Sequence, residues 1–495
     1  MADYDLTIIG GGINGTAIAR DAAGRGLRVL LVEQNDLSSG TSWTSSKLIH
    51  GGLRYLEQGA FALVQEGLHE RALLLHMAPH IIWPTRFVLP HHKALRPAWQ
   101  LRLGLFIYDL LAGKSMLPGT CTVDLTTDDA GKPLQPHLRK GFEYSDCCVD
   151  DARLVILNAV DAAEHGADIR TRTYFERAER HNQHWHITLN AKSEQSTITS
   201  RALINAAGPW IEQVNAHMPS DIPRGAVKLV KGSHIVVPRL FDHNKAYIFQ
   251  NADGRIVFAI PYHHNFTLIG TTDVIVSGDP APGAASAEEI TYLCKLANDY
   301  FKKSITPSDV VWNFSGIRAL YDHRSISSKD LSRDYYLALD GDADHPPLLS
   351  IYGGKLTAAR HLAETALEKL APFLPMGERW TEHSSLPGGD FPWNGFDDMV
   401  KNVCKQWGFL TPAHARRLVR AYGTRITHIL GGAKAMGDLG ECFGADLTAR
   451  EVCYLMQHEW AQTADDILWL RTKLGLYFNL QQKEKLASFI ASEQQ

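Results

Sequence analysis

The sequence predicts an α/β protein in which an antiparallel sheet is inserted into a nucleotide-binding domain and a helical domain ends the chain. A glycine-rich turn between two short apolar runs opens the chain, as in a βαβ unit. Extended segments succeed one another between residues 231 and 272, and capped helix starts dominate after residue 390. We expect a discontinuous nucleotide-binding domain over residues 1–390, an inserted domain over about 70–145 and 220–345, and a helical domain over 391–495.

The individual elements follow from the spacing of apolar residues. Residues 6–9 and 27–32 are typical of buried parallel strands, with a helix over 16–25 between them. Phe61–Met77 carries apolar residues at three- and four-residue steps, which predicts an amphipathic helix. A helix is also predicted at 151–165, and strands at 168–173, 185–189, 202–205, 233–237, 246–250, 255–261 and 266–270. The late helices are predicted to start at Thr411-Pro412, Thr448-x-x-Glu451 and Thr463-x-x-Asp466.

Composition narrows the class of protein. The chain has 495 residues and a net charge of −4, which argues against a nucleic-acid-binding protein with basic residues spread over the whole chain. Its seven cysteines include no Cys-x-x-Cys pair, so we expect a reducing compartment without a disulfide framework. No basic leader precedes the first strand and no apolar run is long enough to span a bilayer. His181, His184 and His186 lack an acidic partner and a zinc motif, which favours a solvated hairpin over a metal site.

The glycine-rich turn carries the most specific chemistry. Gly10-x-Gly12-x-x-Gly15 lies between a strand and a helix, and Glu33 ends the next strand 18 positions after Gly15. The glycines permit a tight turn and close approach of the backbone to a pyrophosphate, while the acid accepts hydrogen bonds from a ribose. An acid here disfavours a 2′-phosphate, which leaves FAD or NAD as the ligand. We expect Gly10, Gly12, Ile13, Asn14, Gly15 and Glu33 to bind the cofactor.

Two distant segments favour FAD. Residues 202–210 form an apolar run that ends in a small-residue turn, and residues 348–357 form a second run followed by Gly353-Gly354 and a helix. The start of a helix there would stabilise negative charge on a reduced isoalloxazine ring. A compact nicotinamide domain would not need pieces spread over this length of chain. These turns predict further cofactor contacts at Ala207, Gly208, Trp210, Gly354, Leu356 and Thr357.

Six motifs together resemble the FAD-dependent glycerol-3-phosphate dehydrogenases, most closely the bacterial aerobic, respiratory type. Besides the N-terminal glycines, they are Ser45-Ser46-Lys47-Leu48-Ile49-His50-Gly51-Gly52-Leu53-Arg54-Tyr55, Lys231-Gly232-Ser233-His234, Gly270-Thr271-Thr272-Asp273, Ser315-Gly316-Ile317-Arg318 and Gly353-Gly354-Lys355-Leu356-Thr357. The resemblance implies a glutathione-reductase-type FAD-binding domain with an antiparallel substrate sheet and a helical C-terminal domain. It also implies oxidation of sn-glycerol 3-phosphate to dihydroxyacetone phosphate, with electrons passing through FAD to ubiquinone or menaquinone.

The resemblance also implies site residues. A substrate phosphate needs fixed cations, and the planar fork of arginine holds two phosphate oxygens at once. We therefore expect Arg318, Arg333 and Lys355, with Tyr55, to bind and position the phosphate, and Arg54 is a further candidate. Thr272 could orient a substrate hydroxyl or simply form a turn. In the loop after the second strand, Thr41, Ser42, Ser45, Ser46, Lys47 and Leu48 are expected to contact the cofactor.

Alcohol oxidation also requires a group that removes the hydroxyl proton. Histidine suits this role because its pKa is ordinarily about 6.5. His50 and His234 are both candidates, since each lies in one of the quoted motifs. Arg318 could instead polarise the hydroxyl oxygen, and the residues alone leave this choice open.

A reductase of lipid-dissolved quinone must touch the bilayer, so we expect a peripheral protein on the inner, cytoplasmic face of the cell membrane. Residues 96–108 mix apolar, aromatic and arginine side chains and would suit either the headgroup region or a core helix. A homodimer is expected, with the C-terminal helices as dimer or partner contacts. The alternatives are an oxygen-using glycerol-3-phosphate oxidase, a flavin amine or amino-acid oxidase, and a non-catalytic flavin protein.

Overall fold

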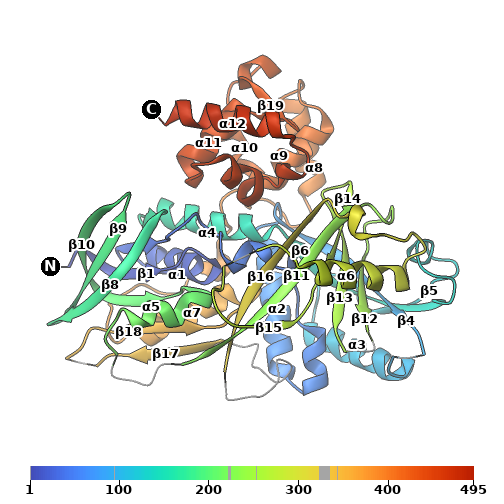
Figure 1. The fold of residues 1–495 in the computed structure, drawn as a ribbon, viewed down its shortest axis with the longest axis horizontal. Coiled ribbons are helices and arrows are strands. Elements are labelled where there is room, and N and C mark those ends of the chain that lie inside the picture. The colour runs from blue at the N-terminus through green and yellow to red at the C-terminus, as the bar shows by residue number, and fades with distance from the viewer. Residues whose placement is uncertain are drawn as a thin grey trace.

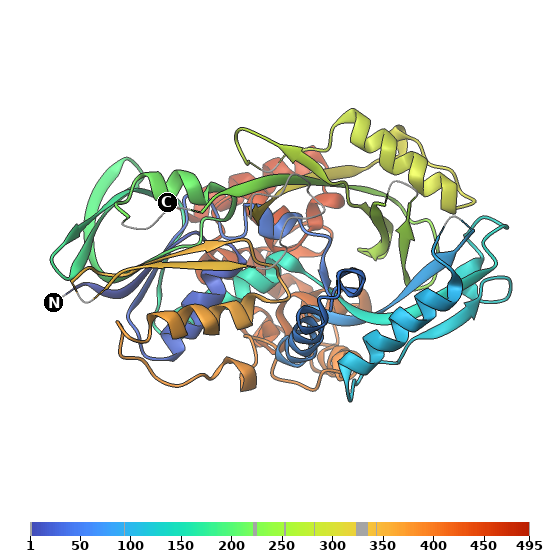
Figure 2. The ribbon, with the colours of Figure 1, turned by 90° about the horizontal axis from the view of Figure 1, so that it is seen from below.

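The structure is a computed structural model that describes residues 2–93, 95–220, 225–251, 254–281, 283–322, 335–342 and 344–494. Two sheets lie side by side along the long axis of the molecule, and the C-terminal helices pack over them as a separate layer (Figures 1 and 2). The three parts predicted from the sequence are therefore present.

The first sheet is the nucleotide-binding sheet. Its neighbouring strands β18, β10, β1, β2 and β7 are all parallel, and β17 pairs antiparallel to β18 at one edge. A hairpin of β8 and β9 extends from β10. The strands are β1 (Tyr4–Ile9), β2 (Val29–Val32), β7 (Asp168–Arg170), β8 (Thr173–His181), β9 (His184–Ala191), β10 (Glu194–Asn205), β17 (Tyr336–Asp340) and β18 (Leu348–Tyr352).

Helices cover one face of this sheet. Helices α1 (Ile13–Gly24), α4 (Asp151–Glu164) and α7 (Ala359–Leu370) bury their apolar residues against β1, β2 and β10 in one continuous core. The β8–β9 hairpin packs on the opposite face with the help of Val214 from α5 (Ile211–Ala216). The sheet is covered on both faces, which explains why its strands have near-continuous apolar sequences.

The second sheet is mostly antiparallel, with one parallel pair between β12 and β4. Helix α6 (Ala287–Tyr300) packs on one face, and α2 (Phe61–Met77) and α3 (Ala98–Ala112) pack on the other. The strands are β3 (Leu48–Ile49), β4 (Ile82–His91), β5 (Cys121–Asp124), β6 (Lys140–Val149), β11 (Val227–Pro238), β12 (Ala246–Gln250), β13 (Ile256–Tyr262), β14 (Phe266–Gly270), β15 (Val274–Val276) and β16 (Trp312–Tyr321).

The C-terminal domain has its own apolar core. It joins the first domain through buried ion pairs, among them Arg153–Glu459, and lies over α4 (Figure 1). Its helices are α8 (Phe396–Gln406), α9 (Pro412–Tyr422), α10 (Ile426–Leu430), α11 (Ala449–Glu459) and α12 (Leu480–Glu493), with a short hairpin of β19 (Cys442–Gly444) and β20 (Leu447–Thr448). Two of the three predicted starts open α-helices, and the third precedes a single-turn π-helix, Asp466–Arg471.

Most predicted elements agree with the structure within a few residues. Helix α2 and strands β12 and β14 have the predicted bounds, and β13 and β14 form the expected hairpin. Two short strands differ from the expected domain limits. Strand β17 falls within the range 220–345 but pairs in the first sheet, and β3 precedes residue 70 but pairs in the second. Such strands are short, and the partner of a strand is not encoded in its own apolar pattern.

Candidate active site

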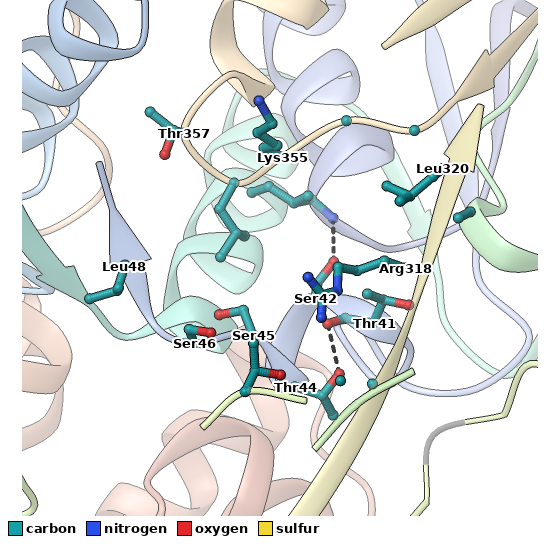
Figure 3. Close-up of a pocket in the computed structure, with 18 of the residues that line it drawn as sticks. Thr41, Ser42, Thr44, Ser45, Ser46, Leu48, Arg318, Leu320, Lys355 and Thr357 are labelled. Atoms are coloured by element: carbon teal, nitrogen blue, oxygen red, sulfur yellow. Dashed lines mark hydrogen bonds between the residues drawn. The ribbon is translucent and has the colours of Figure 1, made fainter. Parts of the chain in front are cut away.

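A cavity of about 1180 Å³ runs between the two sheets. Most of the predicted site residues line it, although they come from segments spread over more than 300 positions. Figure 3 shows Arg318, Lys355, Thr357 and the segment from Thr41 to Leu48 around the same space. The predicted residues on its wall are Gly10, Gly12, Ile13, Asn14, Glu33, Thr41, Ser42, Ser45, Ser46, Leu48, His50, Arg54, Tyr55, Ala207, Gly208, Trp210, His234, Arg318, Gly354, Lys355, Leu356 and Thr357.

The glycine motif forms a backbone cradle at the start of α1. Gly10 has a φ of +112°, and a Cβ there would lie 2.6 Å from the carbonyl oxygen of Ala206. A Cβ on Gly15 would overlap the carbonyl oxygen of Gly10, so this glycine allows the helix to pack against the turn. Gly12 caps α1 without a side-chain hydrogen bond, and the first turn contains no acid. The cradle thus presents a helix N-terminus to the cavity, which suits a pyrophosphate.

Glu33 stands at the end of β2, as predicted. Its carboxylate accepts hydrogen bonds from the backbone N–H of Gly11 at 2.7 Å and of Asn35 at 2.9 Å. Burial raises the pKa of Glu33, and these N–H groups oppose the rise. The two bonds fix the carboxylate on the cavity wall, where its remaining lone pairs can accept from ribose hydroxyls.

The turn after β18 folds back onto the same cradle. The Asn14 amide donates to the carbonyl oxygen of Gly353 at 3.0 Å, while its Oδ1 is buried without a partner among the described residues. Gly353 and Gly354 have φ values of +81° and +103°, and a Cβ on Gly354 would lie 2.8 Å from the Asn14 amide. The unpaired Asn14 Oδ1 and the Gly353-Gly354 turn lie beside the pyrophosphate cradle. This arrangement fits a large dinucleotide whose ring system extends toward β18.

His234 is the more deeply buried of the two candidate bases. It lies on β11, is 3% exposed, and its Nε2 is hydrogen-bonded to the Ser46 hydroxyl at 3.0 Å. Its ring stacks on Phe314 with a centroid distance of 4.9 Å. Burial lowers the pKa of His234 well below its usual value, with further lowering by Lys47 and Arg318. The imidazole is therefore neutral at pH 7 and able to accept a proton.

His50 lines the same cavity and comes immediately after β3. Its backbone N–H donates to the Thr357 hydroxyl at 3.3 Å, which ties the His50 loop to the turn after β18. The structure thus brings both histidine candidates to one cavity. His234 is the more deeply buried of the two.

The cations of the cavity differ in their partners. Arg318 on β16 pairs with Asp273 at 2.9 Å and donates to the carbonyl oxygen of Thr272. The Lys355 ammonium lies 4.3 Å from the centroid of the Tyr55 ring. Among the described residues, no carboxylate pairs with Lys355 or Arg54. Within the described part of the chain, these two charges on the cavity wall have no internal counter-ion, an arrangement that suits an anionic ligand.

Three predicted residues lie outside the cavity wall. Lys47 is 5% exposed and its ammonium pairs with Asp151 at 2.8 Å, so its contact with a cofactor is not supported. Thr272 is 1% exposed; its hydroxyl accepts from the Ser233 N–H and donates to Glu289, which is a structural role. Gly15 acts through packing, as described above. Arg333 lies outside the described residues.

Sequence reasoning missed several wall residues. Thr271 and Asp273 line the cavity beside Arg318, and both belong to a motif that was recognised without a role for either residue. Trp99, Leu103 and Ile107 of α3 also line it, so the cavity extends as far as this helix. The register that joins these segments across the second sheet has no local signal in the sequence.

The fold and the site define a dinucleotide-dependent oxidoreductase. A family model described as "FAD dependent oxidoreductase" matches residues 5–360, and one described as "C-terminal domain of alpha-glycerophosphate oxidase" matches residues 379–493. The chain therefore belongs to the FAD-dependent oxidoreductase family, and it is an enzyme with FAD as cofactor.

Similar proteins cover the whole chain. A glycerol-3-phosphate dehydrogenase of Pseudomonas aeruginosa is 49% identical over 99% of this chain and 95% of its own length. The aerobic glycerol-3-phosphate dehydrogenase of Escherichia coli K12 is 47% identical over 99% and 98%. A D-erythritol 1-phosphate dehydrogenase of Brucella abortus is 46% identical over 98% and 96%. The crystal structure of a Bacillus halodurans glycerol-3-phosphate dehydrogenase complexed with FAD matches with a TM-score of 0.77 and 25% identity, over 99% and 94%. These findings confirm the predicted fold, cofactor and family resemblance.

Proposed function

We propose that this enzyme oxidises sn-glycerol 3-phosphate to dihydroxyacetone phosphate and passes the electrons to a membrane quinone. The observation that carries the proposal is a pair of cations, Arg54 and Lys355, for which the described residues supply no counter-ion, in the cavity that also holds the dinucleotide cradle and His234. Two relatives of nearly half identity are named as glycerol-3-phosphate dehydrogenases, which supports the same substrate.

The cations explain the preference for a phosphate. A phosphate monoester carries nearly two negative charges at neutral pH, and each cation can form charge-assisted hydrogen bonds to its oxygens. Lys355 is held against Tyr55, so its side chain has lost part of its freedom before a ligand binds. Arg318 is partly neutralised by Asp273, and we assign it to the substrate hydroxyl rather than to the phosphate.

The chemistry needs a proton acceptor at the substrate hydroxyl. FAD supplies the acceptor for the hydride that leaves C2. His234 is held neutral by burial and oriented by Ser46 and Phe314, and we assign to its ring the removal of the hydroxyl proton. The Arg318 guanidinium stabilises the negative charge that develops on the substrate oxygen as this proton leaves, until the carbonyl has formed. We leave His50 as a positioning residue that joins its loop to Thr357.

A comparison of kcat/KM for three substrates tests this proposal. The relatives include a D-erythritol 1-phosphate dehydrogenase, so a phosphate site alone does not select glycerol 3-phosphate. We expect the highest kcat/KM, with an artificial electron acceptor, for sn-glycerol 3-phosphate, lower values for D-erythritol 1-phosphate, and no measurable rate with glycine. A higher value with erythritol phosphate would reassign the substrate within the same class. A higher value with an amino acid would contradict the phosphate site.

Helix α3 supports the membrane part of the proposal. Its buried residues Leu105 and Tyr108 face the protein, whereas Trp99, Leu103, Phe106 and Leu110 are 66%, 51%, 57% and 68% exposed. These four residues recur at three- and four-residue steps, so they form one apolar stripe on the outer face of the helix. Of the two alternatives left open for residues 96–108, this exposure favours the headgroup region over a core helix, because only the opposite face of α3 is buried. We propose that this α3 stripe lies in the headgroup region.

The same helix offers a path for quinone. Trp99 and Leu103 belong both to the exposed stripe and to the cavity wall, so the cavity is continuous with the face that we place on the membrane. A lipid-dissolved quinone could then reach the cofactor without leaving the apolar phase. None of the helices in the described part of the chain is long and apolar enough to span a bilayer. We propose a peripheral attachment on the inner face of the cell membrane, and a homodimer that sedimentation would test.

A further inference from the structure

One short segment of the C-terminal domain, residues 466–477, contacts both of the other two parts of the chain. The segment begins with the π-helix Asp466–Arg471 and continues into a turn of 3₁₀-helix, Leu474–Leu476. Single π-turns are rare and occur frequently at functional sites. None of the described residues of this segment lines the cavity, so any effect of the segment on the site must act through the residues behind the cavity wall.

Two contacts hold the segment in place. Arg471, at the end of the π-helix, is 1% exposed and donates to the Asp36 carboxylate at 2.7 and 2.9 Å, in the loop that follows Glu33. At the C-terminal end of the segment, the Tyr477 hydroxyl donates to the carbonyl oxygen of His263, in the turn between β13 and β14. The segment therefore spans from the ribose loop of the first sheet to a hairpin of the second.

An aromatic stack connects the middle of the segment to His234. The Trp469 ring stacks on Trp312 with centroids 4.4 Å apart and an interplanar angle of 19°. Trp312 contacts Phe314 at 5.0 Å, and Phe314 stacks on His234 at 4.9 Å and 15°. Phe314 is fully buried, and the Trp43 ring stacks against both Trp312 and Phe314, with centroid distances of 5.9 and 6.0 Å. The ring that we assign as base thus rests on a column whose last member belongs to the C-terminal domain.

The charges around His234 are partly neutralised by ion pairs. Lys47 pairs with Asp151, and Arg318 pairs with Asp273. From the C-terminal side, Lys473 lies 5.5 Å from the centroid of the Trp43 ring, and burial lowers its pKa to about 8. The Ser46 hydroxyl is the hydrogen-bond partner of His234. Burial is the strongest influence on the His234 pKa, ahead of Lys47 and Arg318, and the stacked Phe314 ring contributes to that burial.

We propose that Trp469 is a positioning residue for the reaction: it closes the aromatic column behind His234, keeps water away from the ring and holds it toward the cavity. The C-terminal domain then completes the active site without touching the substrate. This inference rests on the proposed function in one respect, namely that His234 is the base.

The test is the titration of His234 in the FAD-loaded full chain. ¹³C-labelled histidine gives a signal for each ring, and the His234 signal is identified by its loss in His234→Asn. Trp469→Leu removes the stack and admits water, so the pKa of His234 should rise toward 6.5. Trp469→Phe keeps an aromatic ring and should restore most of the difference. Trp469→Met keeps much of the side-chain volume without the ring and serves as the second variant if Trp469→Leu does not fold.

The matched control is Trp407→Leu, which removes a tryptophan buried in the core of the same helical domain, where its Nε1 donates to Gly431. We expect the His234 titration to be unchanged in this variant, although the domain is destabilised. A folded Trp469→Leu or Trp469→Met protein with an unchanged His234 titration would overturn the inference, and so would an equal shift in the control.

Failure of this inference can be distinguished from failure of the proposed function. If His234→Asn retains the rate of flavin reduction, the assignment of the base is wrong, whatever Trp469 does to the titration. If His234→Asn loses that rate while the titration of the Trp469 variants is unchanged, only the role of Trp469 is wrong. In the variants that shift the titration, flavin reduction should slow more at pH 6 than at pH 8, because the ring becomes protonated in the lower range.

Discussion

The two ends of the cavity are built in different ways. At the dinucleotide end, the backbone makes the site: Gly10, Gly12 and Gly15 shape a turn, and α1 presents its N–H groups. At the substrate end, side chains make it, brought together from β11, β16 and the turn after β18. A backbone site needs a fixed local spacing, whereas a side-chain site needs the whole fold. The dinucleotide end can therefore be recognised in the sequence. The substrate end depends on the pairing of distant strands, which only the structure provides.

The largest expected effect is at the substrate end. His234→Asn keeps a polar side chain of similar size but removes the basic nitrogen, so the rate of flavin reduction should fall about 10²- to 10⁴-fold. His50→Asn is the matched control and should lower the rate less than about tenfold. Stopped-flow reduction by glycerol 3-phosphate measures both. A larger loss for His50→Asn would exchange the two roles.

Removal of a phosphate cation should have the next largest effect. Lys355→Met leaves the stem of the side chain but removes a charge-assisted hydrogen bond, which predicts about a 10- to 100-fold loss of kcat/KM. With glycerol, which has no phosphate, the same substitution should leave kcat/KM almost unchanged. Lys369→Met, on the exposed last turn of α7, is the control and should behave as wild type. An equal loss with glycerol would show that Lys355 supports the fold rather than the phosphate.

At the dinucleotide end, a single methyl group should be enough to weaken cofactor binding. Gly12 has an ordinary φ of −83°, and a Cβ there would lie 3.2 Å from the Ser42 hydroxyl, so Gly12→Ala should fold. The methyl group would nevertheless obstruct the approach of a pyrophosphate, and FAD affinity should fall about tenfold. Flavin fluorescence titration of the apoprotein measures this. Gly432→Ala, at a position with open space around it, is the control. Unchanged affinity in Gly12→Ala would place the pyrophosphate elsewhere.

The smallest expected effect is at the outer end of the cavity, on the α3 stripe. Leu110 is 68% exposed, so Leu110→Ser should leave the fold intact. If the stripe enters the headgroup region, partition into anionic phospholipid vesicles should fall about three- to tenfold. Leu480→Ser removes an equally exposed leucine from the C-terminal domain and should not change the partition. Co-sedimentation measures both variants, and an unchanged Leu110→Ser would remove α3 from the membrane contact.

The comparison also explains how far the sequence could be interpreted. The glycine motif, Glu33 and the bounds of α2 follow from spacing alone, because local geometry determines them. Lys47 and Thr272 were expected at the site on the strength of their motifs, yet both are occupied by internal partners, Asp151 and Glu289. A polar residue in a motif can face a cavity or bind an internal partner. The choice depends on residues outside the motif, such as Asp151 and Glu289, and the motif itself carries no information about them.

The C-terminal domain illustrates the same limit. Its helices were predicted from caps and apolar periodicity, and its core is self-contained. The contacts of Trp469 with Trp312 and of Arg471 with Asp36 join segments more than 150 positions apart. These contacts matter to the site because the two sheets and the C-terminal domain pack together there. The sequence has no periodic pattern that predicts such a packing.

The most direct test is to mix the anaerobic, FAD-loaded enzyme with sn-glycerol 3-phosphate and follow the visible absorption band of the oxidised flavin. We expect the band to bleach, faster than with D-erythritol 1-phosphate, and a water-soluble quinone to restore it faster than oxygen does. Restoration mainly by oxygen would replace the quinone with oxygen as acceptor. A folded, flavin-loaded protein whose band does not bleach with glycerol 3-phosphate would show that this compound is not the substrate.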